Sequence, residues 1–119
     1  MKTTYEIVGF EKIAELDNYE NGCIGKGSAT WVDCRIHADT IDRLKKKILS
    51  FIGAEPDAME IDACEEAGRI DVHKTENADG CDPTAQESAA WKAGELDLYA
   101  VTYTCMVQKV ARETISLID

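Results

Sequence analysis

The sequence predicts an α+β fold: one small domain, residues 1–119, with a mainly antiparallel sheet of about five strands and two helices packed against it. Three observations predict this fold. Several short stretches alternate apolar and polar side chains, and two stretches carry the start and stop signals of helices. These stretches follow in the order strand, strand, helix, hairpin, helix, strand, which favours helices on one antiparallel sheet. Finally, a chain of 119 residues that is 45% apolar can form a single core.

The first quarter of the chain predicts one strand and a loop. Residues 3–10 alternate and predict a strand with apolar side chains on both faces. These side chains are Tyr5 and Ile7 on one face and Val8 and Phe10 on the other. Residues 11–16 could add a helical turn. Residues 17–28 contain three glycines and are expected to form an irregular loop.

A second strand is expected over residues 30–36, and a helix follows it. One face of the strand would carry Thr30, Val32, Cys34 and Ile36, and the other Trp31, Asp33 and Arg35. Asp39 is the expected N-cap of the helix, and Gly53 lies where a left-handed C-terminal cap belongs. The residues that recur at helical spacing are Ile41, Leu44, Ile48, Phe51 and Ile52.

A β-hairpin is expected next, because residues 59–63 and 70–72 alternate around a turn. If residues 67–68 form its loop, Ala63 lies opposite Val72 and the apolar side chains stay together. The other face is then dominated by carboxylates. It carries Glu60, Asp62, Cys64, Glu66, Arg69, Asp71 and His73.

The last third of the chain predicts a helix and a long strand. Thr84 and Glu87 form a capping box, and Gly94 is expected to end the helix. The alanines that would let this helix lie close to the sheet are Ala85, Ala89, Ala90 and Ala93. Residues 96–111 are rich in Val, Tyr and Thr and predict a central strand. Residues 113–119 are expected to form an edge strand or a last helical turn.

The net charge of −10 comes from the middle of the chain. Residues 54–97 hold thirteen acidic and three basic side chains, whereas residues 1–53 and residues 98–119 are each neutral. Such a field repels nucleic acid phosphates and anionic membrane surfaces and attracts basic protein surfaces. We therefore expect a basic protein surface as partner, and no direct contact with nucleic acid or membrane.

The cysteines and the N-terminus indicate a cytoplasmic location. The five cysteines are odd in number and widely spaced, which argues against a disulfide framework and favours free thiols. Residues 1–10 lack the pattern of a secretion signal. No stretch approaches the roughly 20 apolar residues that a membrane span needs.

Two ligand-binding motifs are incomplete. Residues 22–28 contain a Gly-Lys pair, but the spacing is too short for a phosphate-binding loop and a strand is expected to follow. The Ile-Gly-Lys-Gly run resembles the loop of KH domains, which requires two flanking helices. Residues 75–86 have Thr75 and Gln86 where a calcium loop needs its first and last carboxylates. We expect turns at both places.

Zinc binding and catalysis remain open as alternatives. Cys34 and His37 have the gap of a zinc ligand pair, and Cys64 could meet His73 across the hairpin. Residues three apart on a regular strand point to opposite faces, so the first pair converges only where the strand ends. A small enzyme would rely on these same side chains. The main expectation is no catalytic residue, no metal and no cofactor.

These observations favour a non-enzymatic acidic binding protein. The hairpin and the following loop would dock onto a basic surface of a nucleic-acid-handling complex, with carboxylates in place of phosphates. Such an inhibitor or regulator is similar in general character to the small acidic proteins of phages and mobile elements that block CRISPR or restriction complexes. The expected contact residues are Glu60, Asp62, Glu66, Asp71, Glu76, Asp79 and Asp82, with Trp91 as an aromatic anchor.

Two further features leave other interpretations open. The basic cluster Arg43, Lys45, Lys46 and Lys47 is explained by a solvated helix face, or by a contact with an acidic partner or with the acidic middle of the chain. The apolar tail with Ile115, Leu117 and Ile118 could add a strand between copies, which would make a homo-oligomeric structural protein or a homodimer.

Overall fold

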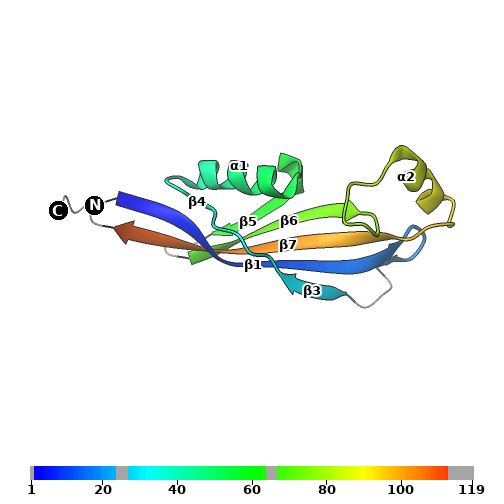
Figure 1. The fold of residues 1–119 in the computed structure, drawn as a ribbon, viewed down its shortest axis with the longest axis horizontal. Helices are drawn as coiled ribbons and strands as arrows, with labels where there is room; N and C mark the ends of the chain where they lie inside the picture. Colours follow the sequence, from blue (N-terminus) through cyan, green and yellow to red (C-terminus); the bar gives the residue numbers. More distant parts are fainter. Residues whose placement is uncertain (1, 24–26, 64–66, 113–119) are drawn as a thin grey trace.

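One antiparallel sheet of seven strands forms most of the described chain, which comprises residues 2–23, 27–63 and 67–112 of the computed structural model. The strand order is β2-β1-β7-β6-β5, and β3 and β4 also pair with β1 (Figure 1). The strands are β1 (Lys2–Asn18), β2 (Gly22–Cys23), β3 (Ser28–Trp31), β4 (His37–Ala38), β5 (Met59–Ala63), β6 (Ala67–Glu76) and β7 (Leu98–Arg112). The helices are α1 (Ile41–Ile52), α2 (Ala85–Lys92) and a 3-10 turn, Pro56–Ala58. The predicted α+β class is confirmed.

The two longest strands, β1 and β7, make the molecule long and thin. They pair from Lys2 opposite Arg112 to Asp17 opposite Leu98. The molecule measures 64 × 23 × 22 Å, and its radius of gyration is 17.6 Å, against about 13–14 Å for a compact domain of this length. The predicted central strand is confirmed. The helical turn predicted at residues 11–16 is wrong, because pairing with β7 keeps this stretch extended.

β1 contains a β-bulge at Val8. The register of β1 with β7 shifts between Ile7 and Gly9, so one residue is inserted. The prediction that Ile7 and Phe10 face opposite sides is wrong, since the insertion brings both side chains to the face that holds the core. Val8 itself is 60% exposed.

Two short strands, β3 and β4, take the place of the single strand predicted over residues 30–36. The five residues between them form no strand. Two backbone hydrogen bonds still connect this segment to β1: Val32 N to Phe10 O (2.8 Å) and Ile7 N to Ile36 O (3.1 Å). The bulge accounts for the interruption, since an inserted residue disrupts the ladder locally. Within the interruption the predicted alternation holds, because even-numbered side chains are half-buried and odd-numbered ones are exposed.

The turn after β1 also differs from the irregular loop predicted at residues 17–28. β2 folds back on the end of β1, with Gly22 opposite Asn18. Gly22 has a φ of 71°, a left-handed conformation that favours glycine in such a tight turn. Part of the predicted loop is therefore a β-hairpin.

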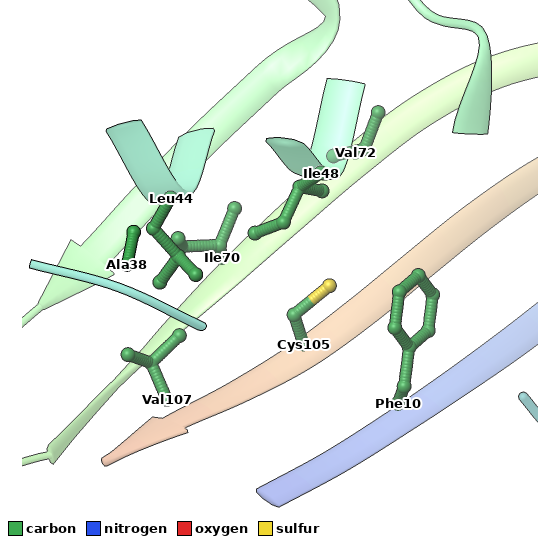
Figure 2. Close-up of a cluster of buried hydrophobic side chains, with 8 residues drawn as sticks. All are labelled: Phe10, Ala38, Leu44, Ile48, Ile70, Val72, Cys105 and Val107. Carbon is green, nitrogen blue, oxygen red and sulfur yellow. The ribbon is translucent and has the colours of Figure 1, made fainter. Parts of the chain in front are cut away.

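α1 covers one face of the sheet and completes the core. Leu44 and Ile48 are fully buried on its inner side, and Phe51 remains 52% exposed at its end. Figure 2 shows the two helix residues clustered with side chains of β1, β6 and β7. The core consists of Phe10, Ala38, Leu44, Ile48, Ile70, Val72, Cys105 and Val107.

The ends of α1 follow from its capping residues. Thr40, rather than the predicted Asp39, is the N-cap, because its hydroxyl accepts a hydrogen bond from the backbone N–H of Arg43 at 3.1 Å. Asp39 instead pairs with the Arg43 guanidinium at 2.8 Å. Gly53 is the C-cap as predicted, with a left-handed φ of 76° and a hydrogen bond from its N–H to Leu49 O.

The predicted hairpin forms from β5 and β6, but in another register. Ala63 lies opposite Gly68, not opposite Val72. The loop predicted at residues 67–68 is wrong, because β6 already begins at Ala67, where pairing with β7 starts. The register differs by an even number of residues, so the side chains keep their predicted faces.

α2 has the predicted ends but another position. Its capping box is formed: Glu87 N donates to Thr84 Oγ1 at 3.1 Å, and Thr84 N donates to Glu87 Oε1 at 3.0 Å. This backbone donor holds the pKa of Glu87 below its ordinary value. Gly94, with a φ of 77°, ends the helix. However, α2 lies at one end of the sheet (Figure 1), and none of its eight residues is buried.

No helix among the described residues is both long and apolar enough to cross a membrane. The predictions for residues 113–119, including the proposed oligomer contact, fall outside the described residues.

Candidate binding surface

The sheet has one covered face and one open face. α1 covers the face that carries Phe10, Ile70 and Cys105, and no helix of the described chain lies on the other face (Figure 1). The strand register places one side chain from each of five strands in a line across the open face. This acidic row comprises Glu60, Asp71, Thr104, Glu11 and Trp31.

Two of the predicted hairpin carboxylates belong to the acidic row. The Glu60 side chain is 76% exposed, and its Oε2 lies 3.7 Å from His73 Nε2. Asp71 is only 17% exposed, and its Oδ2 lies 3.2 Å from Arg69 Nε. The Oδ1 atom of Asp71 is buried and has no hydrogen-bond partner. Glu60 is thus available to a partner, whereas Asp71 contributes its charge from a half-buried position.

Glu76 does not belong to the open face. It is 2% exposed and lies on the covered face. Its Oε1 accepts a hydrogen bond from Lys12 Nζ at 2.7 Å, and its Oε2 accepts one from the Tyr103 hydroxyl at 2.8 Å. The bond to Glu76 raises the pKa of Lys12, and burial, with the same carboxylate, raises the pKa of Tyr103. Glu76 is a buried structural carboxylate and cannot contact a partner from this position.

The other predicted acidic residues are separated from the acidic row. Asp79 and Asp82 are exposed in the loop between β6 and α2. Asp82 Oδ1 lies 2.8 Å from Nζ of Lys74, a residue whose side chain is on the covered face. The side chain of Asp62 and the whole of Glu66 lie outside what the structure describes. The predicted residues that the structure describes therefore do not form one continuous surface.

Trp91, the predicted anchor, has a structural role. Its indole N–H donates to Asp17 O at 3.1 Å, and its ring lies edge-on to Tyr19 with centroids 4.9 Å apart. These contacts attach α2 to the end of β1. The exposed indole is instead that of Trp31, at the end of β3, which is 78% exposed.

Trp31 is part of an exposed apolar patch on the open face. The patch also contains Val8 and Met106, which are 60% and 47% exposed. A Cβ atom at Gly9 would lie 3.5 Å from Met106 and 3.7 Å from the Trp31 ring. The side chains of Trp31 and Met106 thus both lie beside Gly9 of β1.

A hollow of about 220 Å³ lies beside this apolar patch. It is lined by residues 7–10 of β1 and by residues 31–34 of the facing segment. The hollow coincides with the bulge at Val8 and with the interrupted ladder between β3 and β4. Asp33, at its edge, is exposed.

The basic cluster of α1 lies on the covered side of the sheet. Arg43 pairs with Asp39 at 2.8 Å, and Lys47 Nζ donates to His37 O at 2.6 Å. These cations do not lie on the open face, so they do not neutralise the carboxylates of the acidic row.

Metal and thiol chemistry find little support in the described residues. No group of three or more His, Cys, Asp or Glu in this part of the chain could hold a metal ion. Cys34 packs against the core whereas His37 is exposed, and Cys64, the companion predicted for His73, falls outside the described chain. Burial raises the pKa of Cys34, and it raises that of Cys105 to about 12. Both thiols are therefore protonated and unreactive near neutral pH.

Comparison with models of known protein families found no match, and searches of curated proteins and of solved structures found no significant match.

Proposed function

We propose that this chain is a non-enzymatic binding protein that docks its open sheet face onto a basic surface of another protein. The observation that carries the proposal is the acidic row beside the exposed apolar patch, on a face that no helix of the described chain covers. Exposed aromatic and Met side chains next to charged groups are a combination that protein interfaces commonly use.

Charge favours a basic partner. Glu11, Glu15, Glu60 and Asp71 lie on the open face, where Arg69 pairs with Asp71. Carboxylates arranged in this way steer a cationic surface into contact and discriminate against anionic ones. At physiological ionic strength the field of an exposed charge extends about 8 Å. The charges of the face itself therefore decide the contact, rather than the remote loop carboxylates.

The partner class that this chemistry suits best is a nucleic-acid-handling protein, because such proteins have large basic grooves for phosphates. An acidic sheet face in such a groove would exclude the nucleic acid. The chain would then act as an inhibitor or regulator, and the partner's affinity would fall steeply with salt.

The test is a charge reversal with a matched control. The double variant Glu11→Lys, Glu60→Lys changes the open face, and the control Asp42→Lys, Glu95→Lys makes the same charge change at exposed positions elsewhere. A partner is first captured from nuclease-treated lysate at low salt and then purified for titration calorimetry. We expect the first variant to lose at least tenfold in affinity and the control to lose little. Equal losses would show that only the net charge matters, and the proposed face would be wrong.

A further inference from the structure

The hollow beside Val8 is built by one irregularity of the sheet. The bulge inserts a residue into β1, and the facing chain leaves its ladder between Trp31 and His37. The resulting space of about 220 Å³ is below the 300–1,000 Å³ usual for pockets that enclose a small-molecule ligand. Its size suits a single side chain of a protein partner.

The aromatic wall of the hollow is the indole of Trp31. This side chain is 78% exposed although it is the largest apolar group on the open face. Gly9 of β1 lies beside the ring, since a Cβ atom built at Gly9 would be 3.7 Å from it. An exposed indole can offer its π face to a cation, and Trp is the best of the aromatic side chains for that contact.

Carboxylates lie on two sides of the indole. Glu11 is directly opposite Trp31 in the β1–β3 ladder, so the two side chains are neighbours on the same face. Asp33 is two residues further along the chain, lines the hollow and is exposed. Arg35 follows on the same side and lines the next hollow, so it marks the limit of the acidic environment.

We propose that this hollow binds one arginine side chain of the basic partner. The inference rests on the proposed function and names the group that it recognises. The guanidinium would stack on Trp31 and donate hydrogen bonds to Asp33 and Glu11. Arginine fits better than lysine, because its planar guanidinium both stacks on aromatic rings and pairs with carboxylates through several donors. A lysine ammonium at this place would gain charge attraction without the stacking.

The experiment compares two peptides of equal charge, octa-arginine and octa-lysine, in low-salt titrations followed by NMR. The chain has two indole N–H groups, and that of Trp91 is bonded to Asp17 O, so it serves as an internal reference. We expect octa-arginine to bind about two- to fivefold more tightly than octa-lysine, as a cation–π contact at an exposed site would give. The indole signal of Trp31 should shift and that of Trp91 should stay.

Substitutions of Trp31 distinguish binding to its indole from attraction to the general negative charge of the open face. Trp31→Leu should abolish the preference for octa-arginine by weakening octa-arginine binding more than octa-lysine binding, and Trp31→Phe should retain part of the preference. Tyr19→Leu, which removes another half-exposed aromatic ring, should leave the preference intact. A preference that survives Trp31→Leu, or equal binding of both peptides to the native chain, would overturn the arginine site but not the acidic face. Failure of both peptides to bind would overturn the proposed function as well.

Discussion

At the scale of single residues, Glu76 shows how the fold accommodates a charge in its interior. The carboxylate is 2% exposed, yet the Lys12 ammonium and the Tyr103 hydroxyl satisfy both of its oxygens. Lys74, whose Nζ lies 3.7 Å from the same carboxylate, is held on its other side by Asp82. Removing a buried carboxylate with such partners costs stability, because the partner charge left behind has no opposite charge to compensate it.

We expect Glu76→Gln to lower the free energy of unfolding by about 3 kcal/mol, the low end of the range for breaking a buried ion pair. The low end applies because Lys12 is 27% exposed and water can compensate part of its charge. Urea denaturation at pH 7 measures the change. Asp82→Asn is the control, since that carboxylate is 71% exposed and its loss should cost less than about 1 kcal/mol. Equal effects of the two substitutions would contradict the buried network.

Cys105 predicts a loss of stability in alkaline solution. Burial raises the pKa of this thiol from 9.0 to about 12, so the folded state retains a proton that the unfolded state releases. Its contribution is complete below pH 9 and is lost as the pH rises toward about 12, at no more than about 1.4 kcal/mol per pH unit. The raised pKa values of Lys12 and Tyr103 act in the same direction above about pH 10.

Urea titrations between pH 8 and 11 test this dependence. Cys105→Ala should flatten the decrease that begins near pH 9, whereas Cys81→Ala should leave it unchanged, since Cys81 is exposed. An identical alkaline profile for native chain and Cys105→Ala would refute the assignment.

The residue scale also shows which site residues could be predicted from the sequence. Glu76 has the same parity as Ile70 and Val72, so the alternation already indicated an inward position that its charge obscured. Trp31 has the same parity as the exposed Asp33 and Arg35, so its exposure agrees with their alternation. The position of Trp91 depends on a hydrogen bond to Asp17, 74 residues away, for which the local sequence has no signal.

At the scale of elements, the two helices contribute unequally. α1 inserts Leu44 and Ile48 into the core, whereas no residue of α2 is buried. α2 is held by its capping box and by Trp91. The stability of the sheet therefore depends on α1.

We expect Leu44→Ala to destabilise the protein by about 2–5 kcal/mol, because it opens a cavity between α1 and the sheet. Lys46→Ala, on the exposed side of the same helix, should be close to neutral. The midpoints of thermal or urea unfolding measure both. A small effect of Leu44→Ala would mean that α1 is not part of the cooperative core.

The ends of the helices could be predicted, because they depend on nearby residues. The pairing of the strands could not be predicted in the same way. The caps at Gly53, Thr84 and Gly94 are local signals, and each lies at a helix end. The hairpin register depends on where β6 meets β7, and the extension of β1 through residues 11–16 depends on the same strand. Such long-range pairing has no trace in a window of a few residues.

At the scale of the whole molecule, a long sheet has a short core. The buried cluster lies under α1, while the α2 end of the sheet has few buried side chains. A molecule 64 Å long and 22 Å across in its thinnest direction cannot protect all of its length equally.

Hydrogen exchange should therefore divide the molecule into regions. We expect the slowest amides in β6, β7 and the part of β1 that faces α1, and faster exchange in α2 and at the outer ends of β1 and β7. Native-state exchange followed by NMR or mass spectrometry measures this order. Uniform protection from one end to the other would contradict it.

The fold class was predictable at this scale, because it depends on the order of elements alone. The location of the charge was not. A segment that is acidic in sequence divides among an open face, a buried network and a distant loop, because alternate side chains of a strand point to opposite faces.

The bulge at Val8 controls which side of the sheet each later residue of β1 occupies. If Val8 instead took a regular place in the ladder, opposite Met106, every later residue of β1 would move on by one partner and its side chain would exchange faces. Phe10 and Lys12 would then point to solvent, and Glu11 would point at the helix. The one unpaired residue thus keeps the carboxylates of β1 on the exterior, and a chain without it would pair regularly with the same side chains facing the core.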